Sequence, residues 1–298
     1  MEIVNNCPVC NSSDFSDFIK CIDYTVSRET FQIVSCNNCK FKFTNPRPLQ
    51  SEIGKYYQSD DYISHSNSKK GAFNLAYHFV RNLAINRKIK LINSFNTTRK
   101  RLIDIGCGTG EFLYNAKKDD WETLGLEPSE QAREYAIKYN GLSVYNLDYF
   151  DNIPDQSFDV ITMWHVLEHV PDLGAFLSKI NRILVNNGTL LIAVPNADAF
   201  DCSYYKDKWA AYDVPRHLNH FSIDTMTKLL INNDLSIIKI ITMPFDSFYI
   251  SMLSEKYSGS GVLKMIVMGI INGLSSNLKA KRNPKFSSSL IYLIKKNY

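Results

Sequence analysis

From Arg101 onward, short apolar runs that predict buried strands alternate with segments whose apolar residues recur at helical spacing. The predicted strands are 101–105, 121–127, 142–146, 158–164, 188–194, 236–243 and 288–296. The predicted helices between them are 129–140, 172–184 and 222–235, the first with Ser129 as its N-cap. This alternation favours an α/β fold in which a mainly parallel sheet has helices on both faces, over residues 99–298.

The rest of the chain follows other patterns. Residues 1–48 hold two C-x-x-C pairs around a strand-like run and end at the proline-rich "FTNPRP". Residues 49–98 predict a helical linker or lid, since apolar residues recur at near-helical spacing in 73–95. Residues 244–288 are too long for a simple connection between strands, which indicates a functional insertion.

Four of the seven cysteines predict a metal site. Cys7 and Cys10 form one C-x-x-C pair and Cys36 and Cys39 the other, a spacing typical of zinc ribbons. Four thiolates leave no open coordination position, so we expect a structural zinc. Cys21, Cys107 and Cys202 are interpreted as ordinary small residues and not as ligands.

Length and charge narrow the function classes. The 298-residue chain carries a net charge of +4, too small by itself to indicate a nucleic-acid partner. Its polar start does not resemble a signal peptide, and no apolar run reaches the roughly 20 residues that span a bilayer. A cytoplasmic location is therefore expected. The sequence predicts no oligomeric state.

The stretch "RLIDIGCGTGEFL" places three glycines directly after a predicted strand. Glycines there let the backbone turn tightly and approach a ligand. The dinucleotide fingerprint would need a glycine at position 111, where Glu111 stands. Glu127 ends the next strand, where a carboxylate can accept hydrogen bonds from both ribose hydroxyls of a nucleoside.

Several linked segments resemble the class I S-adenosylmethionine-dependent methyltransferases: "LIDIGCGTGEF", "GLEPS", "NLDYFDNIPDQSFDVITMWHVLEHV" and "NRILVNNGTLLIAVPN". The resemblance implies a Rossmann-like seven-stranded sheet with an antiparallel last strand. It also implies that the glycine loop cradles the methionine part of the cofactor, that Glu127 binds the ribose and that Asp148 lies near the adenine amino group. The cofactor-binding residues expected from it are Asp104, Gly106, Cys107, Gly108, Gly110, Glu127, Pro128, Asp148, Trp164 and His165.

The segment "DVPRHLNHFS", residues 213–222, is similar to the "HEHLSYFS"-type motif of sugar C-methyltransferases. The resemblance implies that His217 is the catalytic base. His169 and His220 are further catalytic candidates, and His165 competes for the same role. Arg216 is expected to hold an anionic part of the acceptor.

The charge of the cysteine-bearing segment bears on the acceptor. Residues 1–48 contain five basic residues, Lys20, Arg28, Lys40, Lys42 and Arg47, and five acidic ones, Glu2, Asp14, Asp17, Asp23 and Glu29. An RNA-binding module should be clearly basic. We therefore expect O- or C-methylation of a small molecule, such as a sugar or a lipid-linked or phosphate-bearing metabolite, with nucleic acid disfavoured. An RNA methyltransferase and a cofactor-binding scaffold without turnover are the alternatives.

The insertion allows two interpretations. Residues 261–274 are apolar, and six basic residues and no acidic one follow from Lys279 to the end. A buried lid helix followed by a solvated basic edge is the favoured interpretation. Peripheral contact with a membrane through residues 261–296 is the other.

Overall fold

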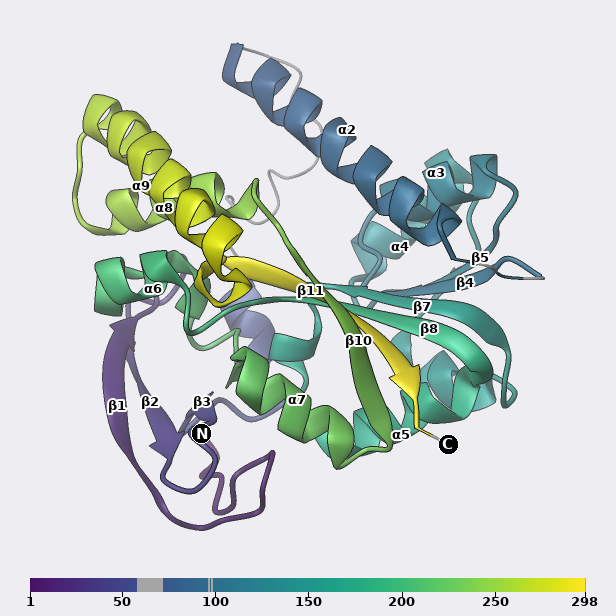
Figure 1. The fold of residues 1–298 in the computed structure, drawn as a ribbon, viewed down its shortest axis with the longest axis horizontal. Coiled ribbons are helices and arrows are strands. Elements are labelled where there is room, and N and C mark those ends of the chain that lie inside the picture. Colours follow the sequence, from purple (N-terminus) through teal and green to yellow (C-terminus); the bar gives the residue numbers. More distant parts are fainter. Residues whose placement is uncertain (58–71, 96, 98, 298) are drawn as a thin grey trace.

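The computed structural model describes residues 1–57, 72–95, 97 and 99–297, with backbone alone for 72–80, and is built around a seven-stranded sheet (Figure 1). The strand order is β10-β11-β8-β7-β4-β5-β6. Strand β11 is antiparallel to both neighbours and the other pairs are parallel. The bounds are β4 Arg101–Ile105, β5 Glu122–Leu126, β6 Val144–Tyr145, β7 Phe158–Trp164, β8 Leu184–Pro195, β10 Leu235–Thr242 and β11 Ser289–Lys296. The seven predicted strands and the antiparallel last strand are confirmed.

Helices cover both faces of this sheet, as predicted, because neighbouring strand residues point to opposite faces. In β4, Ile103 packs in the apolar cluster that contains residues of α5 and α7, whereas Leu102 packs in the cluster with residues of α2, α3 and α4. Ser129 caps α4, as its position predicted. The bounds are α2 Ala72–Asn93, α3 Glu111–Lys118, α4 Glu130–Asn140, α5 Leu173–Ile183, α6 Phe200–Tyr205 and α7 Ile223–Ile231. Residues 58–71 of the expected linker lie outside the described residues.

A second, four-stranded antiparallel sheet carries the N-terminal segment, in the order β1-β2-β3-β9. Its first three strands are Phe15–Ile22, Thr30–Cys36 and Lys42–Thr44, but β9, Asn219–His220, comes from the segment in which catalytic residues were expected. The sequence did not predict β9, because a strand of two residues is too short to show an alternation of apolar and polar positions. This strand joins the cysteine-bearing segment to the candidate site.

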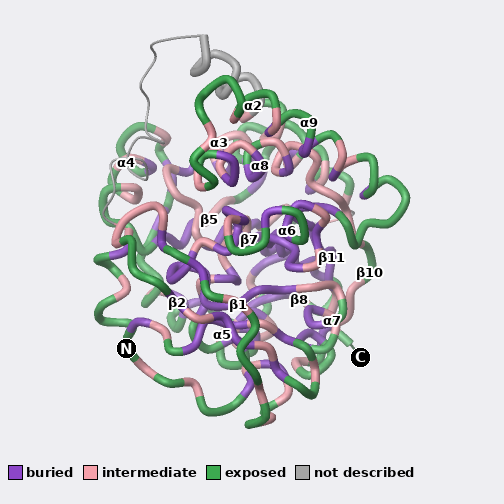
Figure 2. Tube along the Cα trace, turned by 90° about the vertical axis from the view of Figure 1, so that its left-hand side faces the viewer, coloured by how far each residue is buried: buried purple, intermediate pink, exposed green. Residues whose placement is uncertain are grey.

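The insertion is a helical hairpin of α8, Asp246–Tyr257, and α9, Val262–Arg282. It rises beside α2 (Figures 1 and 2), and Tyr257 at the end of α8 stacks on Tyr24, which follows β1. The predicted apolar helix 261–274 continues to Arg282. Its large apolar side chains are exposed, so the favoured interpretation of a buried lid helix was wrong. In the described part of the chain, no helix combines the length and apolar character needed to cross a membrane.

The four predicted ligand cysteines form one cluster. Cys7 Sγ lies 3.5 Å from Cys39 Sγ, and Cys10 Sγ lies 3.5 Å from Cys36 Sγ. A tetrahedral zinc with bonds of about 2.3 Å requires sulfur separations of about 3.8 Å. The donor set and spacing therefore fit zinc. Cys21 and Cys202 are buried in a different apolar cluster.

We predict about one zinc per chain, lost from the variant Cys36→Ser/Cys39→Ser, since two thiolates cannot complete a closed site. Metal analysis by plasma mass spectrometry of protein purified without chelators measures this content. The variant Cys21→Ser should keep its zinc. Wild-type protein without zinc would contradict the assignment.

Candidate active site

The glycine loop lies at the carboxyl end of β4. Gly106, Gly108 and Gly110 have φ angles of 69°, 55° and 81°, which favour glycine over residues with a side chain. A Cβ on Gly106 would come within 2.5 Å of Val166, whereas one on Gly108 would meet nothing within 4 Å. The loop is thus held closely at Gly106 and is open at Gly108, where a ligand can approach the backbone.

Glu127 closes the next turn at the carboxyl end of β5. Its Oε2 accepts a hydrogen bond of 2.8 Å from the Gly108 amide, and its Oε1 accepts one of 2.9 Å from the Ser129 amide. The side chain is buried, although each oxygen keeps a lone pair. Glu127 therefore joins the glycine loop to the turn at which a ribose would lie.

The remaining residues predicted for the nucleoside part follow β5 and β6. Asp148 is exposed and accepts a hydrogen bond from Asn146, and Pro128 is exposed beside Glu127. The structure brings these residues to the same edge of the sheet as the glycine loop. Cys107 packs against Gly125, and burial raises the pKa of its thiol.

Helix α2 brings a cation toward this edge. Lys88 Nζ lies 4.1 Å from the centre of the Trp164 ring, whose Nε1 is buried without a hydrogen-bond partner among the described residues. Asp104 is buried and accepts a hydrogen bond of 2.6 Å from Thr162 Oγ1. Burial raises the pKa of Asp104 to about 7, although the Thr162 hydrogen bond and the Lys88 charge oppose this rise.

Two of the predicted catalytic histidines meet at the carboxyl end of β7. The His169 and His217 ring centres are 4.7 Å apart. Their Nδ1 atoms each donate a 2.9 Å hydrogen bond to a backbone carbonyl, that of Arg216 for His169 and that of Ala211 for His217. With Nδ1 as the donor, the Nε2 atom of each ring is an acceptor whenever the ring is neutral.

Carboxylates face the second nitrogen of His217. His217 Nε2 lies 4.0 Å from Glu168 Oε1 and 3.9 Å from Asp213 Oδ2. Glu168 is buried, and neither of its oxygens accepts a hydrogen bond from the described residues. Burial alone would raise the pKa of this carboxyl, but the nearby His165, His169 and His217 hold it below the usual value. Glu168, His169 and His217 each offer one donor atom within 4.8 Å of the others, so this group could move a proton or hold a cation.

His165 has a different environment from the other two. Its Nε2 lies 3.1 Å from Asp246 Oδ2 of α8, and its Nδ1 lies 3.3 Å from Glu168 Oε1. Burial favours the neutral ring, but the two carboxylates outweigh it and raise the pKa of His165 to about 10. A histidine that is charged at neutral pH does not suit the base role for which His165 was a competitor.

Arg216, expected to bind the acceptor, and His220, a catalytic candidate, each have partners within the chain. The Arg216 guanidinium is 1% exposed and contacts Asp23, Asp213 and the Tyr56 carbonyl. Both carboxylates that it holds belong to the chain, so it is not free to bind those of an acceptor. His220 is buried between Thr44 and the Tyr212 ring, which is perpendicular to its own, and burial lowers the pKa of His220 well below the usual value.

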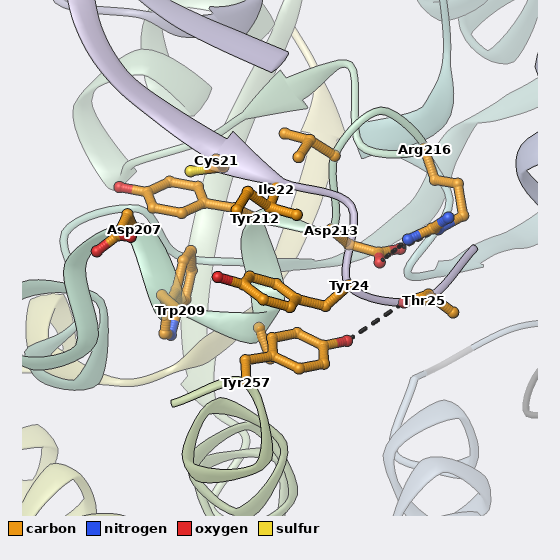
Figure 3. A pocket seen from close by; sticks show the side chains of 12 residues that line it. Cys21, Ile22, Tyr24, Thr25, Asp207, Trp209, Tyr212, Asp213, Arg216 and Tyr257 are labelled. Carbon is orange, nitrogen blue, oxygen red and sulfur yellow. Dashed lines mark hydrogen bonds and ion pairs between the residues drawn. The ribbon is translucent and has the colours of Figure 1, made fainter. Parts of the chain in front are cut away.

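Two cavities lie where the N-terminal sheet meets the larger domain. One, lined by Arg216, Asp213 and the stacked rings of Tyr24 and Tyr257, has a volume of about 10 Å³, room for about one water molecule (Figure 3). The other is an open groove of about 450 Å³. Three lysines, Lys42, Lys206 and Lys285, line this groove together with Asp198. Of these two cavities, the groove is the one large enough for a small-molecule acceptor.

Comparison with known proteins identifies the family. The model of a family described as "Methyltransferase domain" matches residues 77–240, which is more than half of the chain. The chain belongs to this methyltransferase family. It is an S-adenosylmethionine-dependent methyltransferase, and its open glycine loop and Glu127 fit that cofactor.

Known relatives of the methyltransferase are similar at low identity. A ubiquinone biosynthesis O-methyltransferase of Bradyrhizobium diazoefficiens is 23% identical over 66% of this chain and 80% of its own length. A methyltransferase structure from Archaeoglobus fulgidus has a TM-score of 0.50 at 20% identity, over 76% of this chain and all of the other. The [4+2]-cyclase SpnF has a TM-score of 0.52 at 15% identity, over 85% of this chain and 98% of the other. These structures show the shared fold.

Three residues of the methyltransferase site were not predicted. Asp213 stands four residues before His217, Lys88 lies on α2, and Asp246 lies in the insertion. Lys88 on the apolar helix 73–95 and Asp246 near the start of the insertion belong to no recognisable motif, so the sequence did not single them out. Their part in the site appears only when α2 and α8 fold over the ends of β4 and β7.

We predict that Glu127→Ala weakens binding of S-adenosylmethionine by about 1.5 to 3 kcal/mol, the range for hydrogen bonds to a charged group. Titration calorimetry measures the affinity. Glu122→Ala, at the opposite end of β5, should leave it unchanged. Equal affinities of wild type and Glu127→Ala would remove Glu127 from ribose binding.

The raised pKa of Asp104 predicts a pH dependence of stability. Between about pH 4 and pH 7 the folded protein binds a proton at Asp104 that the unfolded chain releases, so the contribution of Asp104 to the free energy of unfolding falls as pH rises. Relative to Asp104→Asn, wild-type protein should therefore lose a few kcal/mol of unfolding free energy, to order of magnitude, between pH 4.5 and pH 8.

Urea denaturation of both proteins without cofactor, at several pH values, measures this difference. Titrating groups that do not interact with Asp104 cancel because the two proteins share them, whereas Lys88 is coupled to Asp104. Parallel pH profiles would show that Asp104 does not titrate in this range.

Proposed function

We propose that the enzyme methylates a hydroxyl oxygen of a small, negatively charged acceptor, with His217 as the general base. The observation that carries the proposal is the orientation of His217. Its Nδ1 donates to the Ala211 carbonyl, and its Nε2 faces two carboxylates at the same sheet edge as the glycine loop. This arrangement supports proton removal beside a bound cofactor.

The histidine geometry suits a base. A neutral ring with its proton on Nδ1 has a lone pair on Nε2 that can take the proton of a hydroxyl. Glu168 and Asp213, at 4.0 and 3.9 Å, would stabilise the imidazolium that forms. S-adenosylmethionine, when bound, supplies an activated methyl group on a sulfonium. His169, packed against the His217 ring, would position it.

Transfer to oxygen agrees with the relatives, several of which are named as O-methyltransferases. Transfer to carbon is the alternative that the 213–222 segment supports through its similarity to the sugar C-methyltransferase motif. The balanced charge of residues 1–48 disfavours RNA. A cofactor-binding protein without methyl transfer is the remaining alternative.

The lysine-lined groove supports a negatively charged acceptor. Lys42 and Lys285 lie 3.7 and 3.2 Å from Asp198, which balances one of their charges, while Lys206 adds a third positive charge. A phosphate-bearing sugar or metabolite would complement this surface. We further propose that zinc at the four cysteines stabilises the sheet which forms one wall of the groove through Phe18, Ile19 and Lys42.

The experiment combines an acceptor search with one substitution. Cell extract is incubated with the enzyme and methyl-labelled S-adenosylmethionine, and small molecules are separated on an anion exchanger. We expect a labelled, retained product. His217→Ala should form it at least about 10²-fold more slowly, the effect of losing one general base, with unchanged cofactor affinity.

Three controls distinguish the alternatives. His220→Asn, which alters a neighbouring buried histidine, should remain within a few-fold of wild type. Label that disappears after ribonuclease treatment would favour RNA as the acceptor. If chelator stops the reaction while the zinc content is unchanged, Glu168, His169 and His217 bind a required cation, and His217 is not the base.

A further inference from the structure

Helix α9 is amphipathic, but its small and polar side faces the protein and its large apolar side faces away. The residues that face the protein are small or polar: Gly269, Asn272, Gly273, Ser276 and Ala280. The residues that face away are large and apolar: Leu263, Ile266, Val267, Ile270, Ile271, Leu274 and Leu278. Their exposed fractions range from 37% to 77%. A surface helix normally turns its apolar side to the core.

The inward side of α9 packs by close contact and hydrogen bonds. A Cβ on Gly269 would lie 3.0 Å from the Met252 Cα, and one on Gly273 would lie 3.0 Å from the Phe248 Cα, so only glycine allows α8 this close. Asn272 donates to the Tyr205 hydroxyl and Ser276 to the Asp201 carboxylate. Glycines four residues apart, with polar bonds between helices, are the packing used by helices whose outer surface contacts lipid.

Positive charge accompanies the outward apolar side. Lys264 lies near the start of α9, and Lys279, Lys281 and Arg282 lie in its last turn. The chain has no acidic residue from Val262 to its end. At about 1.5 Å per residue, this 21-residue helix is roughly 30 Å long, with cations near both ends and apolar side chains between them.

We propose that the α9 face, defined as the seven outward apolar residues with Lys264, Lys281 and Arg282, binds the surface of a bilayer that contains anionic lipid. A helix lying in the interface buries its apolar side among acyl chains while its basic residues contact acidic headgroups. A second copy of the chain fits less well, because an antiparallel two-fold contact would bring Lys264 of one protomer beside the basic end of the other.

The position of the hairpin connects this surface to the site. Asp246, the first residue of α8, contacts His165 at the carboxyl end of β7. The hairpin and α2 rise at the same end of the molecule (Figure 1). The α9 face would therefore hold the enzyme at a membrane through a hairpin whose first residue contacts the candidate site. Binding to lipid does not depend on the proposed acceptor or on His217.

Flotation of the full-length protein with vesicles tests the proposal. The two vesicle types are phosphatidylcholine alone and phosphatidylcholine with phosphatidylserine. We expect flotation with the anionic vesicles, and at least about tenfold weaker partitioning for Val267→Ser/Ile270→Ser/Leu274→Ser. Lys264→Gln/Lys281→Gln/Arg282→Gln should abolish the preference for phosphatidylserine.

Matched controls separate this effect from general loss of apolar surface. Ile231→Ser/Ile238→Ser removes two side chains that are 58% and 56% exposed elsewhere, and should float like wild type. Circular dichroism should show that all variants are folded, since the substituted side chains are exposed. Wild-type protein that floats with neither vesicle, or a serine variant that floats equally well, would overturn the proposal. A dimer in light scattering that only the serine variant loses would assign the face to a second copy instead.

Discussion

The buried contact of Arg216 with two aspartates connects the parts of this enzyme. Its guanidinium holds Asp23 from the N-terminal segment and Asp213 from the loop after β8, and donates to the Tyr56 carbonyl. Asp23 also accepts hydrogen bonds from the amides of Thr25, Val26 and Ser27, and these bonds stabilise its negative charge. These bonds and Arg216 hold the pKa of Asp23 below its usual value although burial acts in the opposite direction.

The backbone of Arg216 carries this constraint into the site. Its carbonyl orients the His169 ring, and the next residue is His217. Two residues later β9 begins and pairs with β3, which places the cysteine-bearing sheet against residues 213–222. Removing one partner of a buried ion pair typically costs 3 to 5 kcal/mol, because the remaining charge stays buried. The N-terminal segment is therefore part of what positions the histidines.

The sequence predicted the features that depend on local pattern. Alternating strands and helices predicted the sheet, and C-x-x-C spacing predicted which four cysteines would cluster. Both patterns depend only on residues that are close together in the chain. The roles of Arg216 and His220 could not be predicted this way. An arginine beside a histidine in a loop suggests an anion site, and only the fold shows that Asp23, 193 residues away in the chain, occupies it. The sequence also could not predict that the apolar side of α9 faces outward, because the same apolar pattern results whether the large residues face the core or the solvent.

We propose that the glycine loop, Glu127 and the His217 group form one site in which a methyl group is transferred. The most direct test is a crystal structure with S-adenosylhomocysteine, the product that remains after the methyl group has left. We expect both ribose hydroxyls to contact Glu127 and the sulfur to face the Nε2 atoms of His169 and His217. A product bound away from Glu127, or with its sulfur on the side of the sheet edge away from these histidines, would contradict it.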